Sequence, residues 1–357
     1  MSKLSLLPII VAGVLACVPA HAQDRSSPDE PRPFAAVVER ARDLQPLRTL
    51  IVGRDGAVVV EEGFRGGSPG RPTNVKSASK SVVSALVGIA IDKGVLEGVD
   101  QPVAPLLAGK LPPNPDPRLA KITVGNLLSM QAGLERTSGP NYGAWISSRD
   151  WVRAALARPF VAEPGAEMLY STGSSHLLSA ILTKASGRST LQLAREWLGD
   201  AGIEIAAWER DPQGIYLGGN QMAMTPRSLF RFGELYRNGG RTPDGRQVVP
   251  EAWVRESFVK RTTTRWSGDD YGYGWFGLRL EGHDVHYGWG YGGQMIYVVP
   301  DLGLTIAMTS DDGAPSARTG YKEALHGIVA EIIGETAGRP VPAPVPAATG
   351  APADPAG

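Results

Sequence analysis

The chain has a single cysteine, Cys17, among its 357 residues. This cysteine lies in an N-terminal apolar segment, so a mature protein that has lost the segment would contain no disulfide. Stability must then come from packing of the hydrophobic residues, which make up 42% of the sequence and suffice for a sizeable core.

An excess of charge of either sign is also missing, because 36 Lys and Arg residues balance 36 Asp and Glu residues. A basic field for nucleic acid or for an anionic membrane surface is therefore not expected. The sequence shows no phosphate-binding loop. His283 and His286 lie three residues apart in an expected strand region, which tends to place them on opposite faces. We expect no nucleic-acid partner, no metal and no cofactor.

No apolar run reaches the length of a membrane span. The run Leu4 to Val18 follows Lys3 and precedes Ala20-His21-Ala22, the small-x-small pattern of a signal-peptidase site. We expect residues 1–22 to be a signal peptide cleaved after Ala22, and the mature protein to be periplasmic or secreted. A lipoprotein signal ending at Cys17 is a minor alternative, because Leu15 is a poor residue at its position.

Composition separates one domain from two flanking segments. Residues 23–33 are polar and Pro-rich, and residues 339–357 are dominated by Pro, Ala and Gly, so both are expected to be disordered. The folded domain is expected over 34–338, and the sequence does not indicate its oligomeric state.

Strand patterns occupy both ends of this domain, and helical patterns occupy its middle. Strands are expected at 48–53, 57–64, 271–280, 284–287, 294–299 and 304–309. Helices are expected at 34–44, 77–93, 123–130, 148–157, 176–186, 190–198, 226–237 and 319–333. This order predicts an α+β fold, an α/β sandwich whose antiparallel sheet is built from both chain ends and flanked by helices, with a mostly helical region inserted at about 77–238.

A serine and a lysine stand three residues apart where the second helix begins, at Ser77 and Lys80. Both side chains project from one face of that helix and can share a proton. A lysine can activate a serine hydroxyl once burial lowers its pKa, and the apolar residues after Lys80 favour burial. A helix N-terminus would also direct backbone N–H groups at developing negative charge.

Other serines compete with this assignment. Ser77 could simply cap the helix. Ser257 has the same spacing to Lys260, but it lies in an amphipathic surface helix. Ser68 matches a Gly-x-Ser-x-Gly elbow, yet Pro69 and Pro72 prevent the helix that an elbow requires.

Several segments together resemble the class C β-lactamase and penicillin-binding-protein family of serine hydrolases. They are Ser77-Ala78-Ser79-Lys80-Ser81, the stretch Asn126 to Leu134, Tyr170-Ser171-Thr172 with the helix after it, Met224 to Gly233, and Trp289-Gly290-Tyr291-Gly292-Gly293-Gln294. The resemblance covers nearly the whole domain in order and implies a β-lactamase-like or penicillin-binding-protein-like fold. It implies Ser77 as the nucleophile, Lys80 as its activating amine and Tyr170 as a general acid/base.

Two motifs depart from the family pattern. The family's Tyr-x-Asn motif becomes Tyr170-Ser171-Thr172, and the resemblance implies that Thr172 contacts substrate. The segment Tyr236-Arg237-Asn238 matches the Tyr-x-Asn pattern literally in sequence, but its context is typical of the end of a helix. The family's Lys-Thr-Gly motif becomes a Gly-rich strand without a cation. We expect the backbone N–H groups of Ser77 and Tyr291 to form the oxyanion hole, and Gly290, Gly292 and Gly293 to admit substrate.

The resemblance therefore implies an esterase or amidase that acts through an acyl-enzyme on a small ester or amide. The alternatives are a β-lactamase, a D-Ala-D-Ala peptidase, or a penicillin-recognising module that is acylated and then stalls.

Overall fold

The computed structural model describes residues 33–313, 315–316 and 319–338. The expected signal peptide, Cys17 and the Pro/Ala-rich tail at 339–357 lie outside the described residues, as does all of the expected disordered N-terminus except Pro33.

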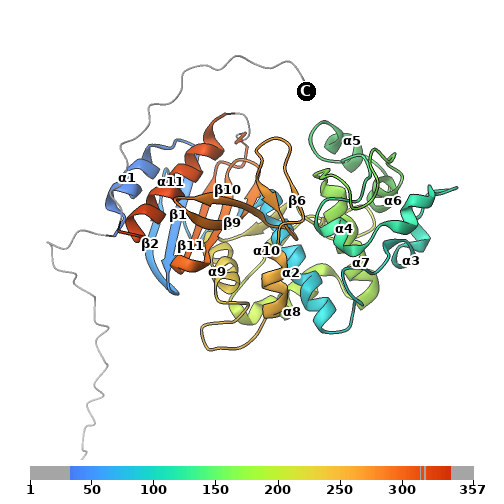
Figure 1. Cartoon of the computed structure of the whole chain (residues 1–357), viewed down its shortest axis with the longest axis horizontal. Coiled ribbons are helices and arrows are strands. Elements are labelled where there is room, and N and C mark those ends of the chain that lie inside the picture. Colours follow the sequence, from blue (N-terminus) through green and yellow to red (C-terminus); the bar gives the residue numbers. More distant parts are fainter. Residues whose placement is uncertain (1–32, 314, 317–318, 339–357) are drawn as a thin grey trace, which may run out of the picture. The chain divides into compact units, whose positions relative to one another are not determined.

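Helices and strands alternate unevenly along this part of the chain (Figure 1). The helices are α1 (Ala35–Asp43), α2 (Ser79–Asp92), α3 (Val103–Leu106), α4 (Val124–Leu128), α5 (Tyr142–Ile146), α6 (Trp151–Leu156), α7 (Thr172–Ser186), α8 (Thr190–Leu198), α9 (Pro226–Arg237), α10 (Glu251–Phe258) and α11 (Tyr321–Thr336). The strands are β1 (Leu47–Arg54), β2 (Ala57–Gly63), β3 (Thr73–Asn74), β4 (Ala207–Trp208), β5 (Met222–Met224), β6 (Thr262–Thr263), β7 (Asp270–Tyr271), β8 (Phe276–Leu280), β9 (His283–Gly290), β10 (Gln294–Val299) and β11 (Leu304–Ser310). Short 3-10 turns are η1 (Lys76–Ala78), η2 (Ala108–Lys110), η3 (Pro117–Lys121), η4 (Gly139–Asn141), η5 (Gly199–Ala201) and η6 (Pro300–Leu302).

Eight strands of the described chain form one sheet in the order β2-β1-β11-β10-β9-β8-β7-β6. Every neighbouring pair in it is antiparallel. The first strands of the domain thus pair directly with its last strand, with Ile51 opposite Ala307. The predicted α+β architecture, an antiparallel sheet made from both chain ends around an inserted helical region, is confirmed.

Alternating side chains of the central strands supply two separate cores. In β10, Met295, Tyr297 and Val299 pack with Leu325 and Val329 of α11. The intervening Ile296 and Val298 belong to the core on the other face, which contains α2, α9 and the inserted helices. All six side chains of β10 are buried, as expected for a strand covered on both faces. In Figure 1, α1 and α11 lie side by side over one face of the sheet.

Three observed elements differ from the predicted ones, at the start of α2, between β7 and β8, and at the start of α7. The predicted helix at 77–93 begins as the 3-10 turn η1 and becomes α-helical only at Ser79. The predicted strand at 271–280 is interrupted at 272–275, where Gly274 has a φ of +78°. The predicted helix at 176–186 begins one turn earlier, at Thr172, with Ser171 extended before it.

Helix α2 lies at the centre of the fold. Every residue from Ser79 to Ala90 is buried, which small and apolar side chains allow on all faces. The helix ends before Gly94, whose φ of +67° suits the left-handed conformation at a helix C-terminus.

The end of β9 presses against the turn that precedes α2. A Cβ added to Gly290 would come within 2.2 Å of the Val75 carbonyl oxygen and 3.1 Å of Lys76 Cβ. Contact this close requires glycine, and because the first obstacle is backbone it cannot rotate away. Gly290 therefore fixes the distance between the sheet and η1.

We predict that Gly290→Ala destabilises the protein by at least about 1–3 kcal/mol, because the added methyl group must separate β9 from η1. Gly277→Ala in β8 is the matched control, since its added methyl group would meet its nearest neighbour at an ordinary 3.5 Å. Urea denaturation of both variants measures the difference, and equal stability of the two would contradict the prediction.

Candidate active site

Ser77 occupies the middle of η1, at the entry to α2. The preceding residue, Lys76, has a φ of +49°, a left-handed conformation that is uncommon for a residue with a side chain. Its N–H donates to Asn74 Oδ1 at 2.9 Å, and its amine pairs with Asp312 at 3.3 Å. These contacts hold a strained backbone directly before the half-buried Ser77.

Lys80 brings its amine to the Ser77 hydroxyl from one helical turn further on. The distance from Lys80 Nζ to Ser77 Oγ is 2.9 Å. The amine also donates to the Gly219 carbonyl at 2.6 Å and to Thr172 Oγ1 at 3.3 Å. A neutral amine has two N–H donors and one lone pair, so these partners leave the lone pair for the Ser77 O–H.

The Lys80 amine is buried away from opposite charge. Lys80 is only 3% exposed, and the three groups that its amine contacts, the Ser77 and Thr172 hydroxyls and the Gly219 carbonyl, are all uncharged. Desolvation lowers the pKa of Lys80 from 10.5 to about 7. A substantial fraction of Lys80 is therefore uncharged at neutral pH and able to accept a proton.

Tyr170 lies just before α7 and faces the same two residues. Lys80 Nζ is 5.0 Å from the centre of its ring. Burial raises the pKa of the Tyr170 hydroxyl above its usual value, and a hydrogen bond to Ser77 opposes that rise. The hydroxyl consequently keeps its proton at neutral pH. Trp266, Tyr271 and Phe276 pack around the ring with centroids 6.0 to 6.2 Å away.

Thr172 is buried, and its hydroxyl is held within the protein. Besides accepting from Lys80, Thr172 Oγ1 lies 3.0 Å from Ser138 Oγ. Ser138 also accepts from the Thr172 N–H at 2.9 Å, so it satisfies a free donor in the first turn of α7. Sequence reasoning did not identify Ser138, because the contact joins a loop to the start of α7, more than thirty residues further along the chain.

Gly219 is the second partner that sequence reasoning missed. Its φ is +82°, and an added Cβ would come within 2.6 Å of Lys80 Cγ. Only glycine permits this close approach of the chain to Lys80. The pair Gly218-Gly219 was the available signal, since adjacent glycines often mark such an approach.

The other predicted residues lie at the end of β9 and in the three-residue turn that joins it to β10. A Gly-rich strand was predicted here, but the strand ends at Gly290, and Tyr291, Gly292 and Gly293 form the turn. Gly292 and Gly293 have φ of +83° and +94°, which the turn requires, and an added Cβ on Gly293 would meet Tyr321 and Ser310. Tyr291 is 50% exposed. Since Gly290 touches the residues just before Ser77, the turn begins beside η1.

Neither competing serine has a basic side chain placed like Lys80. Ser257 Oγ donates to the Trp253 carbonyl at 2.7 Å, while Lys260 lies past the end of α10 and pairs with Asp270. Ser68 lies in the loop between β2 and β3, and a strand rather than a helix follows it.

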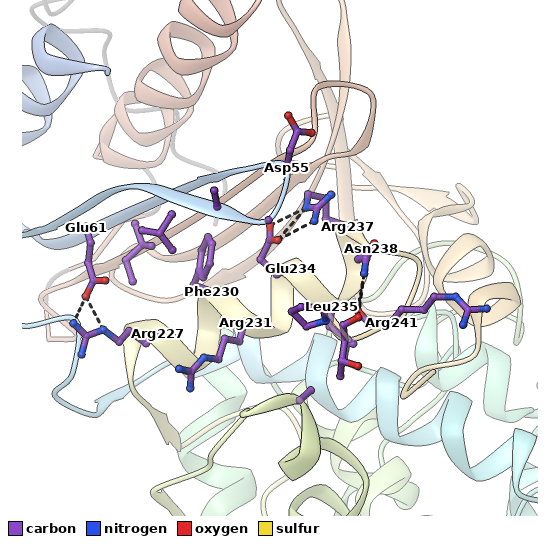
Figure 2. A pocket seen from close by; sticks show the side chains of 17 residues that line it. Asp55, Glu61, Arg227, Phe230, Arg231, Glu234, Leu235, Arg237, Asn238 and Arg241 are labelled. Atoms are coloured by element: carbon purple, nitrogen blue, oxygen red, sulfur yellow. Dashed lines mark hydrogen bonds and ion pairs between the residues drawn. The ribbon is translucent and has the colours of Figure 1, made fainter. Parts of the chain in front are cut away.

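A groove of about 780 Å³ lies elsewhere, between the β1–β2 hairpin and α9 (Figure 2). Its charged side chains largely pair with each other, Glu61 with Arg227 and Glu234 with Arg237. The residues that line it include none of Ser77, Lys80 and Tyr170.

The described residues lack two features. They contain no cluster of three or more His, Cys, Asp or Glu side chains that could hold a metal ion. They also contain no helix that combines the length and the apolar character needed to cross a membrane.

Solved structures share this fold at low sequence identity. EstCE1, a hydrolase with promiscuous acyltransferase activity, superposes with a TM-score of 0.67 at 17% identity and covers 83% of this chain and 98% of its own. A D-stereospecific amidohydrolase from Streptomyces sp. superposes with a TM-score of 0.61 at 18% identity, covering 77% of this chain and 94% of its own.

A curated relative matches a shorter stretch. The "Probable fimbrial assembly protein FimD, serogroup H1" of Dichelobacter nodosus is 33% identical over 144 residues, which are 38% of this chain. The match spans only 36% of the length of that relative.

The family model described as Beta-lactamase matches residues 41–331. This range begins within α1 and ends within α11, so it includes the whole sheet and the inserted helices. The chain therefore belongs to the beta-lactamase family, and its fold is that of the family's serine hydrolases.

Proposed function

We propose that this protein is an exported serine hydrolase that cleaves an ester or amide bond through an acyl-enzyme on Ser77. The observation that carries the proposal is the 2.9 Å contact between Ser77 Oγ and a buried Lys80 amine whose pKa is lowered to about 7. A lysine in this state is a base that matches neutral pH.

The two perturbed pKa values separate the proton-transfer roles. Lys80, with its lowered pKa, takes the proton of Ser77, and Tyr170, with its raised pKa, enters the reaction protonated. In acylation the Ser77 oxygen attacks the substrate carbonyl carbon while its proton passes to Lys80. Tyr170 then donates a proton to the leaving alcohol or amine as the old bond breaks, and Lys80 returns a proton to Tyr170. Water hydrolyses the acyl-enzyme in the second half of the reaction.

Backbone N–H groups would stabilise the oxyanion. We assign this role to Ser77 and Tyr291, and the close contact of Gly290 with Val75 supports it because it brings the start of the turn beside η1. Gly292 and Gly293 contribute the turn conformation. Thr172, whose hydroxyl is buried, is assigned to orienting Lys80 rather than to contacting substrate.

The charge of the site favours a neutral substrate. The β9–β10 turn offers no cation, and the nearby Lys76 is already paired with Asp312. Two arginines elsewhere in the chain are candidates for the missing cation. Arg227 pairs with Glu61 in the separate groove, and Arg318 lies outside the described residues. The hydrolase and amidohydrolase names of the structural neighbours are consistent with acyl transfer from esters or amides.

The sequence supports export. The apolar run and the Ala20-His21-Ala22 pattern support cleavage after Ala22, and we assign the hydrolase domain to 34–338.

We predict that Ser77→Ala abolishes hydrolysis and covalent labelling by a fluorophosphonate, because it removes the nucleophile. Ser68→Ala and Ser257→Ala are the controls and should keep both. Peptide mass mapping of the labelled wild-type protein identifies the modified serine, and an adduct on Ser68 or Ser257 would refute the assignment.

Lys80→Ala and Tyr170→Phe should each lower the acylation rate more than about a hundredfold, the scale of general acid/base catalysis. The wild-type rate should rise as the pH increases through about 7, since protonated Lys80 cannot accept the Ser77 proton. Single-turnover acylation, followed by stopped flow across this pH range, measures both effects. A Tyr170→Phe variant with near wild-type rate would reduce Tyr170 to a packing role.

Short-chain esters or small linear amides should be hydrolysed far faster than penicillins or cephalosporins. A β-lactam brings a carboxylate, and the loss of a charge-assisted hydrogen bond worth about 1.5–3 kcal/mol lowers kcat/KM roughly ten- to a hundredfold. The test compares kcat/KM for a p-nitrophenyl butyrate-type ester and a chromogenic cephalosporin, with Ser77→Ala as the background. Efficient cephalosporin turnover without esterase activity would overturn the prediction, and a burst of acylation without steady turnover would instead support a penicillin-recognising module.

A further inference from the structure

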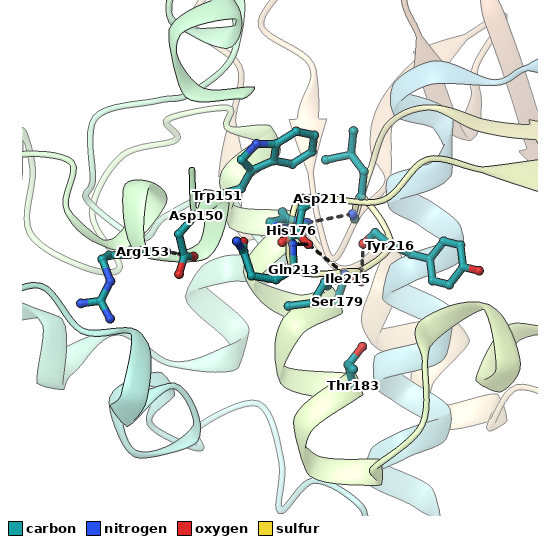
Figure 3. A network of polar contacts seen from close by, with 12 residues as sticks. Asp150, Trp151, Arg153, His176, Ser179, Thr183, Asp211, Gln213, Ile215 and Tyr216 are labelled. Carbon is teal, nitrogen blue, oxygen red and sulfur yellow. Dashed lines mark hydrogen bonds and ion pairs between the residues drawn. The ribbon is translucent and has the colours of Figure 1, made fainter. Parts of the chain in front are cut away.

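His176 and Asp211 form a buried imidazole–carboxylate pair next to the chain segment that contacts Lys80, and neither takes a direct part in the proposed reaction. His176 is in α7, and Asp211 is in the loop between β4 and β5 (Figure 3). Both side chains are fully buried, and His176 Nε2 is 3.1 Å from Asp211 Oδ2. Burial of such a pair is costly unless each polar atom finds a partner.

The other oxygen of Asp211 is fully committed to its own loop. Asp211 Oδ1 accepts from the N–H groups of Gln213 at 2.8 Å and Ile215 at 2.9 Å. The carboxylate therefore has one oxygen for the loop backbone and one for His176. Because a carboxylate only accepts hydrogen bonds, His176 Nε2 must carry the proton.

The other nitrogen of His176 faces the chain that touches Lys80. The Gly218 N–H donates to His176 Nδ1 at 3.4 Å, which requires Nδ1 to be unprotonated. These contacts make Nε2 the donor and Nδ1 the acceptor, which is the tautomer that Asp211 selects. Trp145 and Trp151 pack edge-on against the ring, with centroids 5.6 and 5.7 Å away, and limit its rotation.

The protein leaves almost no space for a side chain at Gly218 or Gly219. An added Cβ on Gly218 would come within 2.1 Å of the Ser175 carbonyl oxygen, and one on Gly219 within 2.6 Å of Lys80 Cγ. The chain here runs between α7 and Lys80. One residue after the N–H that bonds to His176, the Gly219 carbonyl accepts from Lys80 Nζ at 2.6 Å.

We propose that Asp211 and His176 are positioning residues that hold the Gly219 carbonyl where it directs the Lys80 amine toward Ser77. The path runs from the Asp211 carboxylate through the His176 tautomer and the Gly218 N–H to Gly219 and Lys80. This inference rests on the proposed function, because it concerns the base of that reaction.

Asp211→Asn tests the path with almost no change of shape. The Asn oxygen must face the N–H groups of Gln213 and Ile215, since the reversed amide would point donors at donors. Its NH₂ group then faces His176 Nε2, which has to become the acceptor. The proton moves to Nδ1 and opposes the Gly218 N–H, so this hydrogen bond is lost.

The expected result has a spectroscopic and a kinetic part. The ¹⁵N spectrum of His176, assigned by its absence from His176→Gln, should change from the Nε2–H to the Nδ1–H tautomer. The acylation rate and kcat should fall about ten- to a hundredfold, the scale of a small misplacement of a catalytic group, while KM stays close to the wild-type value.

Thr183→Val is the matched control for general weakening of α7. Thr183 Oγ1 lies 3.1 Å from Thr190 Oγ1, so this variant removes a hydrogen bond two turns beyond His176 without touching Gly218. It should lower the melting temperature slightly and leave the acylation rate unchanged.

Two outcomes would overturn the inference. An unswitched tautomer in Asp211→Asn would show that Asp211 does not set the state of His176, and an unchanged acylation rate would show that Lys80 does not depend on this path. Fluorophosphonate labelling of the wild-type protein separates either failure from that of the proposed function, because without labelling at Ser77 the reaction itself is wrong.

Discussion

The burial of one amine is the constraint on which the rest of the site depends. An ammonium group inside a protein is unfavourable, so burial lowers the pKa of Lys80 to about 7 and leaves a substantial fraction of the amine uncharged at neutral pH. The uncharged form of the amine requires uncharged hydrogen-bond partners, and the chain supplies a serine hydroxyl, a threonine hydroxyl and a backbone carbonyl. A carboxylate in the same place would have kept Lys80 charged and unable to accept a proton.

Much of the fold follows from the order of patterns in the sequence. Strands at both ends and helices between them predicted the antiparallel sheet. The mostly apolar sequences of β10 and β11 are typical of strands that are buried on both faces, and both strands are buried throughout. The proximity of Ser77 and Lys80 could be predicted because both residues lie on one helical turn, where sequence spacing alone determines which side chains are close.

The remainder of the site could not be predicted in the same way. The Gly219 carbonyl and the Ser138 hydroxyl reach Lys80 and Thr172 from loops distant in sequence, and a backbone carbonyl has no side chain to reveal it. The early start of α7 was missed because Ser171 does not cap the helix; its hydroxyl instead accepts from the Thr137 N–H. A Gly-rich strand was predicted at 290–293, but only Gly290 belongs to β9, and Tyr291, Gly292 and Gly293 form the turn before β10.

The pairing of β1 with β11 has a consequence for folding. Strand β1 ends at Arg54 and its partner β11 begins at Leu304, so the pairing of these two strands closes a loop that contains most of the domain. Contacts this distant in sequence are slow to form, because the chain loses the entropy of a long loop before it gains any pairing. A chain that emerges progressively from a ribosome or a membrane pore cannot complete its sheet until nearly all of it has emerged. The segment from β9 onward arrives last, and the active site should therefore be among the last parts of the molecule to become ordered.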